Sequence, residues 1–159
     1  MSEEKNIALS NQVYETLCKA LDARGWSYKK DEEDLSVYFG VNGEDLQMNF
    51  CILVDAEREL IRLMSLLPFN MSEENRIDGV VATLSANNCL IDGNFDYDIS
   101  TGAIVFKITS CFEDSVIGED LIQYMISCAC VVVDRYNELF FALDKGAISI
   151  SEFIAKLNS

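Results

Sequence analysis

LSVYFGVNGEDLQMNFCILV, residues 35–54, alternates apolar and polar side chains on both sides of an Asn-Gly pair. The apolar side chains recur at every second position, which places them on one face of a β-strand. Asn42 and Gly43 adopt positive φ angles at low cost, as a tight hairpin turn requires. The stretch therefore predicts two antiparallel strands with one buried face. The apolar members are Leu35, Val37, Phe39 and Val41, then Leu46, Met48, Phe50, Ile52 and Val54.

The segments around this hairpin predict helices and further strands. Helical spacing of apolar residues indicates helices at 10–24, 72–88, 119–145 and a short one capped by Ser149 or Ser151. Further strands are expected at 60–67 and in a hairpin after residue 92, and 26–30 is a candidate for a short one. The order α-β-β-β-α-β-β-α, with a short terminal helix, predicts an α+β fold. Its antiparallel sheet of about five strands should carry helices mainly on one face.

Two helices have informative details. The helix from Ser72 carries an apolar stripe, and Gly79 within it indicates close approach to the sheet. The stripe is Ile77, Val80, Val81 and Leu84. The helix from Glu119 has a wide stripe and a second apolar set, so it should be buried on more than one side. The second set is Leu121, Cys128, Val131 and Leu139.

Length and composition favour a single domain over residues 1–159. The chain is 50% hydrophobic and has 1 Pro, which argues against a disordered chain or an interdomain linker. Residues 1–9 are expected to be flexible, and residues 147–159 to form the short terminal helix.

The charge balance excludes some partners. Asp and Glu number 27 against 12 Lys and Arg, for a formal net charge of -15. Such a surface repels nucleic acids and anionic membranes. The polar, acidic N-terminus lacks the pattern of an export signal, so we expect a cytoplasmic protein whose six cysteines are reduced core residues.

The sequence gives little support for a catalytic or a metal-binding function. There is no His, which removes the commonest general base and zinc ligand. The stretch DGNFDYDISTG, residues 92–102, has acidic residues at alternate positions, but Tyr97 and Ala103 stand where a calcium loop needs Gly and Glu. We interpret it as the solvated side of a hairpin. Carboxylates elsewhere lie in polar turns, so no catalytic residue, metal ligand or cofactor is expected.

One segment resembles a known family. Leu84, Asn87 and Asn88 end a helix, Gly93 and Phe95 follow, and an acidic-to-glycine turn covers 98–102. With the preceding strands and the long helix carrying Tyr136, Leu139 and Phe140, this resembles the bacterial YbjN family, whose members are also called sensory transduction regulators. The resemblance implies a fold like that of type III secretion chaperones, which bind extended segments of other proteins. It implies structural roles for Gly93, Gly102 and Phe95, and no catalytic residues.

The leading hypothesis is a non-catalytic protein-binding module, chaperone-like or regulatory. The partner would bind the sheet face opposite the helices, and the long helix suggests a homodimer. The residues expected on that face are Tyr38, Gln47, Asn49, Cys51 and Leu53. The alternative is a sensor of a ligand or divalent cation that uses residues 92–98, and a carboxylate-based enzyme ranks third.

Overall fold

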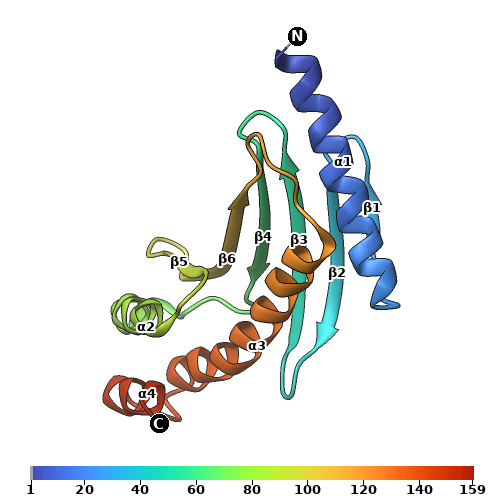
Figure 1. Ribbon diagram of the computed structural model, residues 1–159. Coiled ribbons are helices and arrows are strands. Elements are labelled where there is room, and N and C mark those ends of the chain that lie inside the picture. The colour runs from blue at the N-terminus through green and yellow to red at the C-terminus, as the bar shows by residue number, and fades with distance from the viewer. Residues whose placement is uncertain (1) are drawn as a thin grey trace.

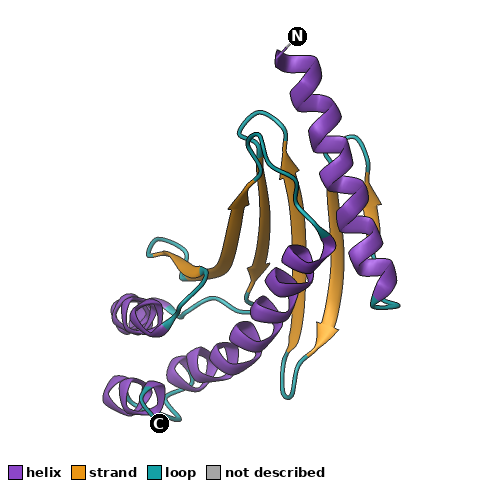
Figure 2. Ribbon diagram, in the orientation of Figure 1, coloured by secondary structure: helices purple, strands orange, loops and turns teal. Residues whose placement is uncertain are grey.

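A computed structural model of the protein describes residues 2–159. These residues form one antiparallel sheet with helices packed mainly on one face (Figure 1 and Figure 2), which confirms the predicted α+β class. The strands are β1 (Lys29–Asp31), β2 (Ser36–Asn42), β3 (Gln47–Asp55), β4 (Leu60–Leu66), β5 (Asn94–Asp98) and β6 (Ala103–Cys111). The helices are α1 (Ser2–Ala23), α2 (Arg76–Cys89), α3 (Glu119–Asp144) and α4 (Ile150–Leu157), with a short 3-10 turn η1 (Glu73–Asn75) before α2.

The sheet has six strands, against a prediction of about five, in the order β1-β2-β3-β4-β6-β5. The sixth is β1, which lies at the end of the candidate short strand 26–30 and pairs with only three residues of β2. The hairpin predicted from residues 35–54 is confirmed, with Val37 opposite Ile52 and Phe39 opposite Phe50. These side chains are buried beneath the helices. The backbone N–H of Gly43 donates to the carbonyl oxygen of Leu46 at 3.0 Å and closes the turn.

Helix α1 begins at Ser2, whereas the sequence predicted a start at Ser10 and flexible residues before it. Ser10 is fully buried and does not cap the helix, since its hydroxyl donates to the carbonyl oxygen of Asn6. Leu9 packs against the core and Lys5 pairs with Asp114 at 2.9 Å, so tertiary contacts extend the helix toward its N-terminus. At the other end Gly25 has a φ of +68°, as expected for a C-terminal cap.

Helix α2 turns its smallest residues to the sheet. Its buried residues are Gly79, Ala82, Thr83 and Ala86. A Cβ on Gly79 would collide with the phenol of Tyr97, which confirms the close approach inferred from that glycine. The apolar stripe of the sequence (Ile77, Val80, Val81 and Leu84) is exposed instead. A stripe of large side chains would hold α2 farther from β5, so the small side is the one that packs.

Helix α3 lies diagonally across the sheet in Figure 1 and supplies much of the core. The second apolar set is only half-buried, and its member Val131 is 70% exposed. The prediction that α3 is buried on more than one side therefore overestimated the burial of this helix. Gly146 ends the helical turn with a φ of +69°. Helix α4 then packs against α2, with Ser149 as its N-terminal cap. No helix within residues 2–159 is both long enough and apolar enough to span a bilayer.

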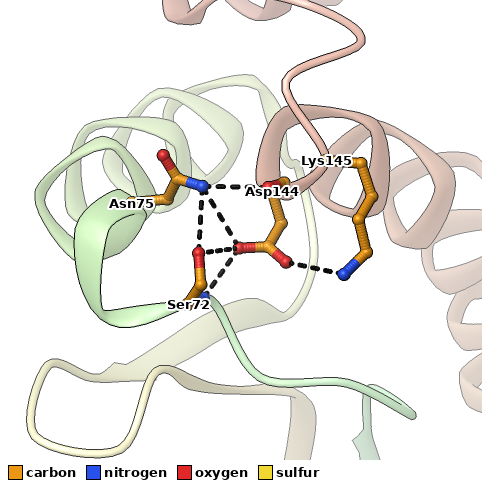
Figure 3. A network of polar contacts seen from close by, with 4 residues as sticks. All are labelled: Ser72, Asn75, Asp144 and Lys145. Atoms are coloured by element: carbon orange, nitrogen blue, oxygen red, sulfur yellow. Dashed lines mark hydrogen bonds and ion pairs between the residues drawn. The ribbon is translucent and has the colours of Figure 1, made fainter.

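A buried carboxylate joins the end of α3 to the start of α2 (Figure 3). Asp144 accepts hydrogen bonds from the backbone N–H of Ser72 at 2.7 Å and from its hydroxyl at 2.8 Å. The amide of Asn75 donates to the carbonyl oxygen of Asp144 at 2.9 Å, and Lys145 lies 3.4 Å from the carboxylate. A negative charge at this position also complements the N-terminal end of the helical segment that begins at η1.

Candidate functional site

We call the sheet face that points away from the helices the open face. The pleat of β2 and β3 directs alternate residues to it. All five residues predicted for a partner surface lie there, because they alternate with buried positions of the same strands. Tyr38, Gln47 and Asn49 are exposed, and Cys51 and Leu53 are half-buried.

One row of paired residues crosses all six strands of the open face. In order it comprises Lys29, Tyr38, Cys51, Met64, Lys107 and Asn94. The middle of this row is apolar and its ends are polar. Leu66 and Val105, which are paired between β4 and β6, extend the apolar centre. Sequence reasoning missed Met64, Leu66 and Val105 because β4 pairs with a strand distant in the chain, and even Leu66 and Val105, the pair closest in sequence, are 39 residues apart.

The charged side chains near this centre are neutralised by partners. Arg62 lies 3.7 Å from Asp55, and Lys107 lies 2.5 Å from Asp96. The pKa of Asp55 is lowered, first by the backbone N–H of Arg58 and then by the Arg58 guanidinium. The middle of the open face is therefore suited to apolar and neutral polar contacts, although the chain as a whole is strongly acidic.

The edge of β2 is only partly covered. β1 pairs with Ser36–Tyr38, so from Phe39 onward β2 has a paired neighbour on the β3 side alone. A groove of about 580 Å³ lies at this point, and its lining includes Tyr38, Gln47 and Asn49. Gly40 contributes to its floor, where an added Cβ would come within 3.1 Å of the Gln47 amide nitrogen. The structure thus brings three of the five predicted residues together in one groove and leaves Cys51 and Leu53 outside it.

Shifted pKa values are found for a thiol of the open face and for five carboxyl groups. Burial raises the pKa of the Cys51 thiol, so this thiol is protonated at neutral pH and is a poor nucleophile. Among the described residues, every carboxyl group with a shifted pKa is shifted downward. A general acid would need the opposite shift.

The carboxylates of residues 92–98 contact their own chain. Asp92 accepts a hydrogen bond from the hydroxyl of Tyr124, and Asp96 pairs with Lys107. Asp98 accepts from the backbone N–H and hydroxyl of Ser100, and hydrogen bonds led by that hydroxyl lower its pKa. Within the described part of the chain, no group of three or more potential metal-ligating side chains is gathered. The segment is the β5–β6 hairpin, as predicted.

The residues that carried the family resemblance have the expected structural roles. Gly93 and Gly102 have φ angles of +75° and +77°. Phe95 is 2% exposed, and its ring lies against those of Phe106, Tyr136 and Phe140.

Comparisons by sequence find no matching family model and no matching curated protein. Comparison with solved structures does find similar folds. YbjN, a proposed transcription regulator from E. coli, aligns with a TM-score of 0.56 at 10% identity, over 79% of this chain and 91% of YbjN.

Two similar structures are complexes. A chain of the ExsC–ExsE complex aligns with a TM-score of 0.60 at 13% identity, over 83% of this chain and 96% of that one. A chain of the HopA1–SchA chaperone–effector complex aligns with a TM-score of 0.54 at 11% identity, over 81% of this chain and 95% of that one. The protein therefore has a YbjN-like fold that is shared with type III secretion chaperones.

Proposed function

We propose that this protein is a non-catalytic protein-binding module, chaperone-like or regulatory, which binds an extended segment of a partner protein. The segment lies on the open face and along the free edge of β2. The observation that carries the proposal is the uncovered apolar centre of the open face beside an incompletely paired strand.

Both features favour an extended polypeptide. Unpaired N–H and C=O groups on an edge strand can pair with an added strand, and the neighbouring groove can hold its side chains. Burial of apolar area contributes about 25 cal/mol per Å², so the centre around Cys51 and Met64 adds affinity without charged contacts. The solved complexes with this fold support the proposal, since one of them joins a chaperone to its effector.

Within the site, each predicted residue has a distinct role. The ring of Tyr38, 47% exposed, is the apolar anchor. The amides of Gln47 and Asn49 donate and accept hydrogen bonds at the groove. Cys51 and Leu53 extend the apolar contact along β3.

The proposal also covers the cellular location, the domain organisation and the oligomeric state of the protein. We place it in the bacterial cytoplasm, with residues 1–159 acting as a single domain and two copies forming a homodimer. The free cysteines agree with a reducing compartment. The acidic surface favours solubility and selects against nucleic acids and membranes.

Substitution of Tyr38 tests the proposal. Affinity capture from a lysate of the source cell, followed by binding of peptides that tile the captured proteins, identifies the partner segment. We expect Tyr38→Asp to weaken the binding of that peptide by about 30-fold, because loss of an aromatic anchor costs about 2 kcal/mol of binding free energy. Fluorescence anisotropy with a labelled peptide measures the affinity.

Val131→Asp is the matched control, since it places the same charge on an exposed apolar position of the helical layer. It should leave peptide affinity unchanged. Equal affinity for the peptide in wild type and Tyr38→Asp would show that the open face is not the binding site.

A further inference from the structure

The free edge of β2 is closed at one end and open at the other. β1 has residues opposite Ser36, Val37 and Tyr38, and none opposite residues 40–42 of β2. Figure 1 shows the second half of β2 lying beyond the end of β1. We call the space beside residues 40–42 the edge site. A strand added at the edge site would continue the line of β1, so one of its ends would meet the chain at residues 27–29, which line that end of the groove.

The closed end carries a cation. Lys29 lies opposite Tyr38 and is exposed. Among the described residues that line the groove, Lys29 is the only charged one. No salt bridge within residues 2–159 involves its ammonium group. In a chain of net charge -15, an unpaired cation at the end of a groove is suited to an anionic group of the ligand.

The open end is acidic, which favours one direction for an added strand. Glu44 and Asp45 are both exposed in the turn that follows β2. A strand antiparallel to β2 begins near these carboxylates and ends beside Lys29, because it runs in the same direction as β1. Its carboxyl end then meets the cation. A parallel strand would place its amino end beside Lys29 and its carboxyl end beside the two acidic residues.

We propose that the edge site binds the free C-terminus of a partner protein, with the terminal carboxylate at the ammonium group of Lys29. This inference rests on the proposed function and deepens it by naming the part of the partner that is bound. A strand that cannot continue past residues 27–29 has to end there or turn away from the sheet, and a chain terminus ends there. A carboxylate accepts strong, charge-assisted hydrogen bonds from an ammonium group. Capture of a terminal carboxylate and addition of a strand to a sheet edge are both established ways of recognising peptides.

The groove also has room for the last side chain of such a tail. Gly40 alternates with Phe39, so it belongs to the open face like Tyr38, and it has no side chain to fill the space beside the Gln47 amide. Residues directly opposite each other in an antiparallel pair direct their side chains to the same face. The tail residue opposite Gly40 therefore places its side chain over the glycine and against the ring of Tyr38. We expect this residue to be apolar.

Two phage-displayed libraries of random heptapeptides test the inference. One library presents a free carboxyl terminus and the other a free amino terminus. We expect enrichment from the first library alone, with an apolar residue at or next to the terminus. The most enriched peptide is then synthesised with a terminal carboxylate and with a terminal amide, and fluorescence anisotropy measures both affinities. The amide should bind about fivefold more weakly, which is the effect of an exposed ion pair.

Substitution of Lys29 identifies the group that reads the terminus. Lys29→Gln should bind the carboxylate and the amide with equal affinity. Lys30→Gln is the matched control, since Lys30 is the next residue of β1 but lies outside the groove lining, with its ammonium group 5.7 Å from the centre of the Tyr28 ring. It should keep the preference for the carboxylate. The preference in the wild type should also disappear at about 1 M salt, because salt screens exposed charges.

The outcomes separate this inference from the proposed function. Equal affinity of the wild type for carboxylate and amide, or a carboxylate preference that survives Lys29→Gln, would overturn the inference. Enrichment from the amino-terminal library alone would overturn it as well. If such peptides still lose affinity in Tyr38→Asp, the proposed function stands and only the C-terminal inference fails. Peptides that depend on Lys29 and not on Tyr38 would contradict the anchor in the proposed function and leave the edge site, whereas no binder from either library would overturn both.

Discussion

Replacement of Gly102 by Ala is expected to lower the free energy of unfolding by about 3 kcal/mol or more. Gly102 has a φ of +77°, a conformation that costs a residue with a Cβ about 1–2 kcal/mol. The added Cβ would also collide with the backbone of Met71, whose nitrogen and carbonyl carbon would lie 3.0 Å away. That backbone cannot easily yield, because Met71 is buried and its N–H donates to the carbonyl oxygen of Gly102 at 2.8 Å.

Gly146→Ala is the matched control for this substitution. Gly146 has a φ of +69°, but nothing lies within 4 Å of an added Cβ. Gly146→Ala should lower the free energy of unfolding only by the cost of a positive φ for a residue with a Cβ, about 1 kcal/mol. Equilibrium unfolding in urea measures both losses. Equal losses in the two variants would mean that the approach of the β5–β6 turn to Met71 is looser than the structure shows.

The second large effect is expected at Asp144. Asp144→Ala should lower the free energy of unfolding by about 3 kcal/mol, because hydrogen bonds to a buried carboxylate contribute about 1.5–3 kcal/mol and the variant leaves their donors unpaired. The donors affected are the backbone N–H and hydroxyl of Ser72. Urea unfolding measures the loss, and Asp134→Ala, which removes a less buried carboxylate of α3, should cost less. A loss below that of Asp134→Ala would contradict the role assigned to Asp144.

The same carboxylate makes stability depend on pH. Desolvation raises the pKa of Asp144, but hydrogen bonds led by the N–H of Ser72 outweigh it, so the pKa lies below its ordinary value. The folded state then binds fewer protons than the unfolded chain, and stability rises with pH in this range. The contribution is complete above the ordinary Asp pKa of about 3.9 and is lost as pH falls through the lower pKa of the folded state. Between about pH 6 and pH 3, the wild type should lose more stability than Asp144→Asn. Equal losses would exclude this linkage.

Local patterns predicted most of the fold. The period of two in residues 35–54 defines a hairpin whatever surrounds it, because the pleat is a short-range property. The same holds for the β5–β6 hairpin and for the glycines with positive φ. The turn between β2 and β3 lies where the sequence predicted it, but its conformation differs, since neither Asn42 nor Gly43 has a positive φ and residues 43–46 form the loop. The start of α1 was wrong by eight residues, because contacts of Leu9 and Lys5 with distant segments, and not a local cap, extend the helix.

The candidate site was predictable only in part. The alternation of side chains along β2 and β3 placed Tyr38 and Gln47 on the face away from the helices. Met64 and Val105 were missed because strand order depends on long-range pairing. The stripe on α2 was visible in the sequence, but periodicity does not tell which side of a helix packs when the opposite side consists of residues as small as Gly79 and Ala82.

By itself, the sequence determined the alternation, the positions of the turns and the acidic, histidine-free character of this protein, since these depend on neighbouring residues or on composition alone. The tertiary structure decided which apolar surfaces remain uncovered. It pairs β4 with β6 to complete the open face, ends β1 early to expose the edge of β2, and turns the large residues of α2 outward. The physical reason is that burial depends on how closely distant elements can approach, and local periodicity carries no information about that distance.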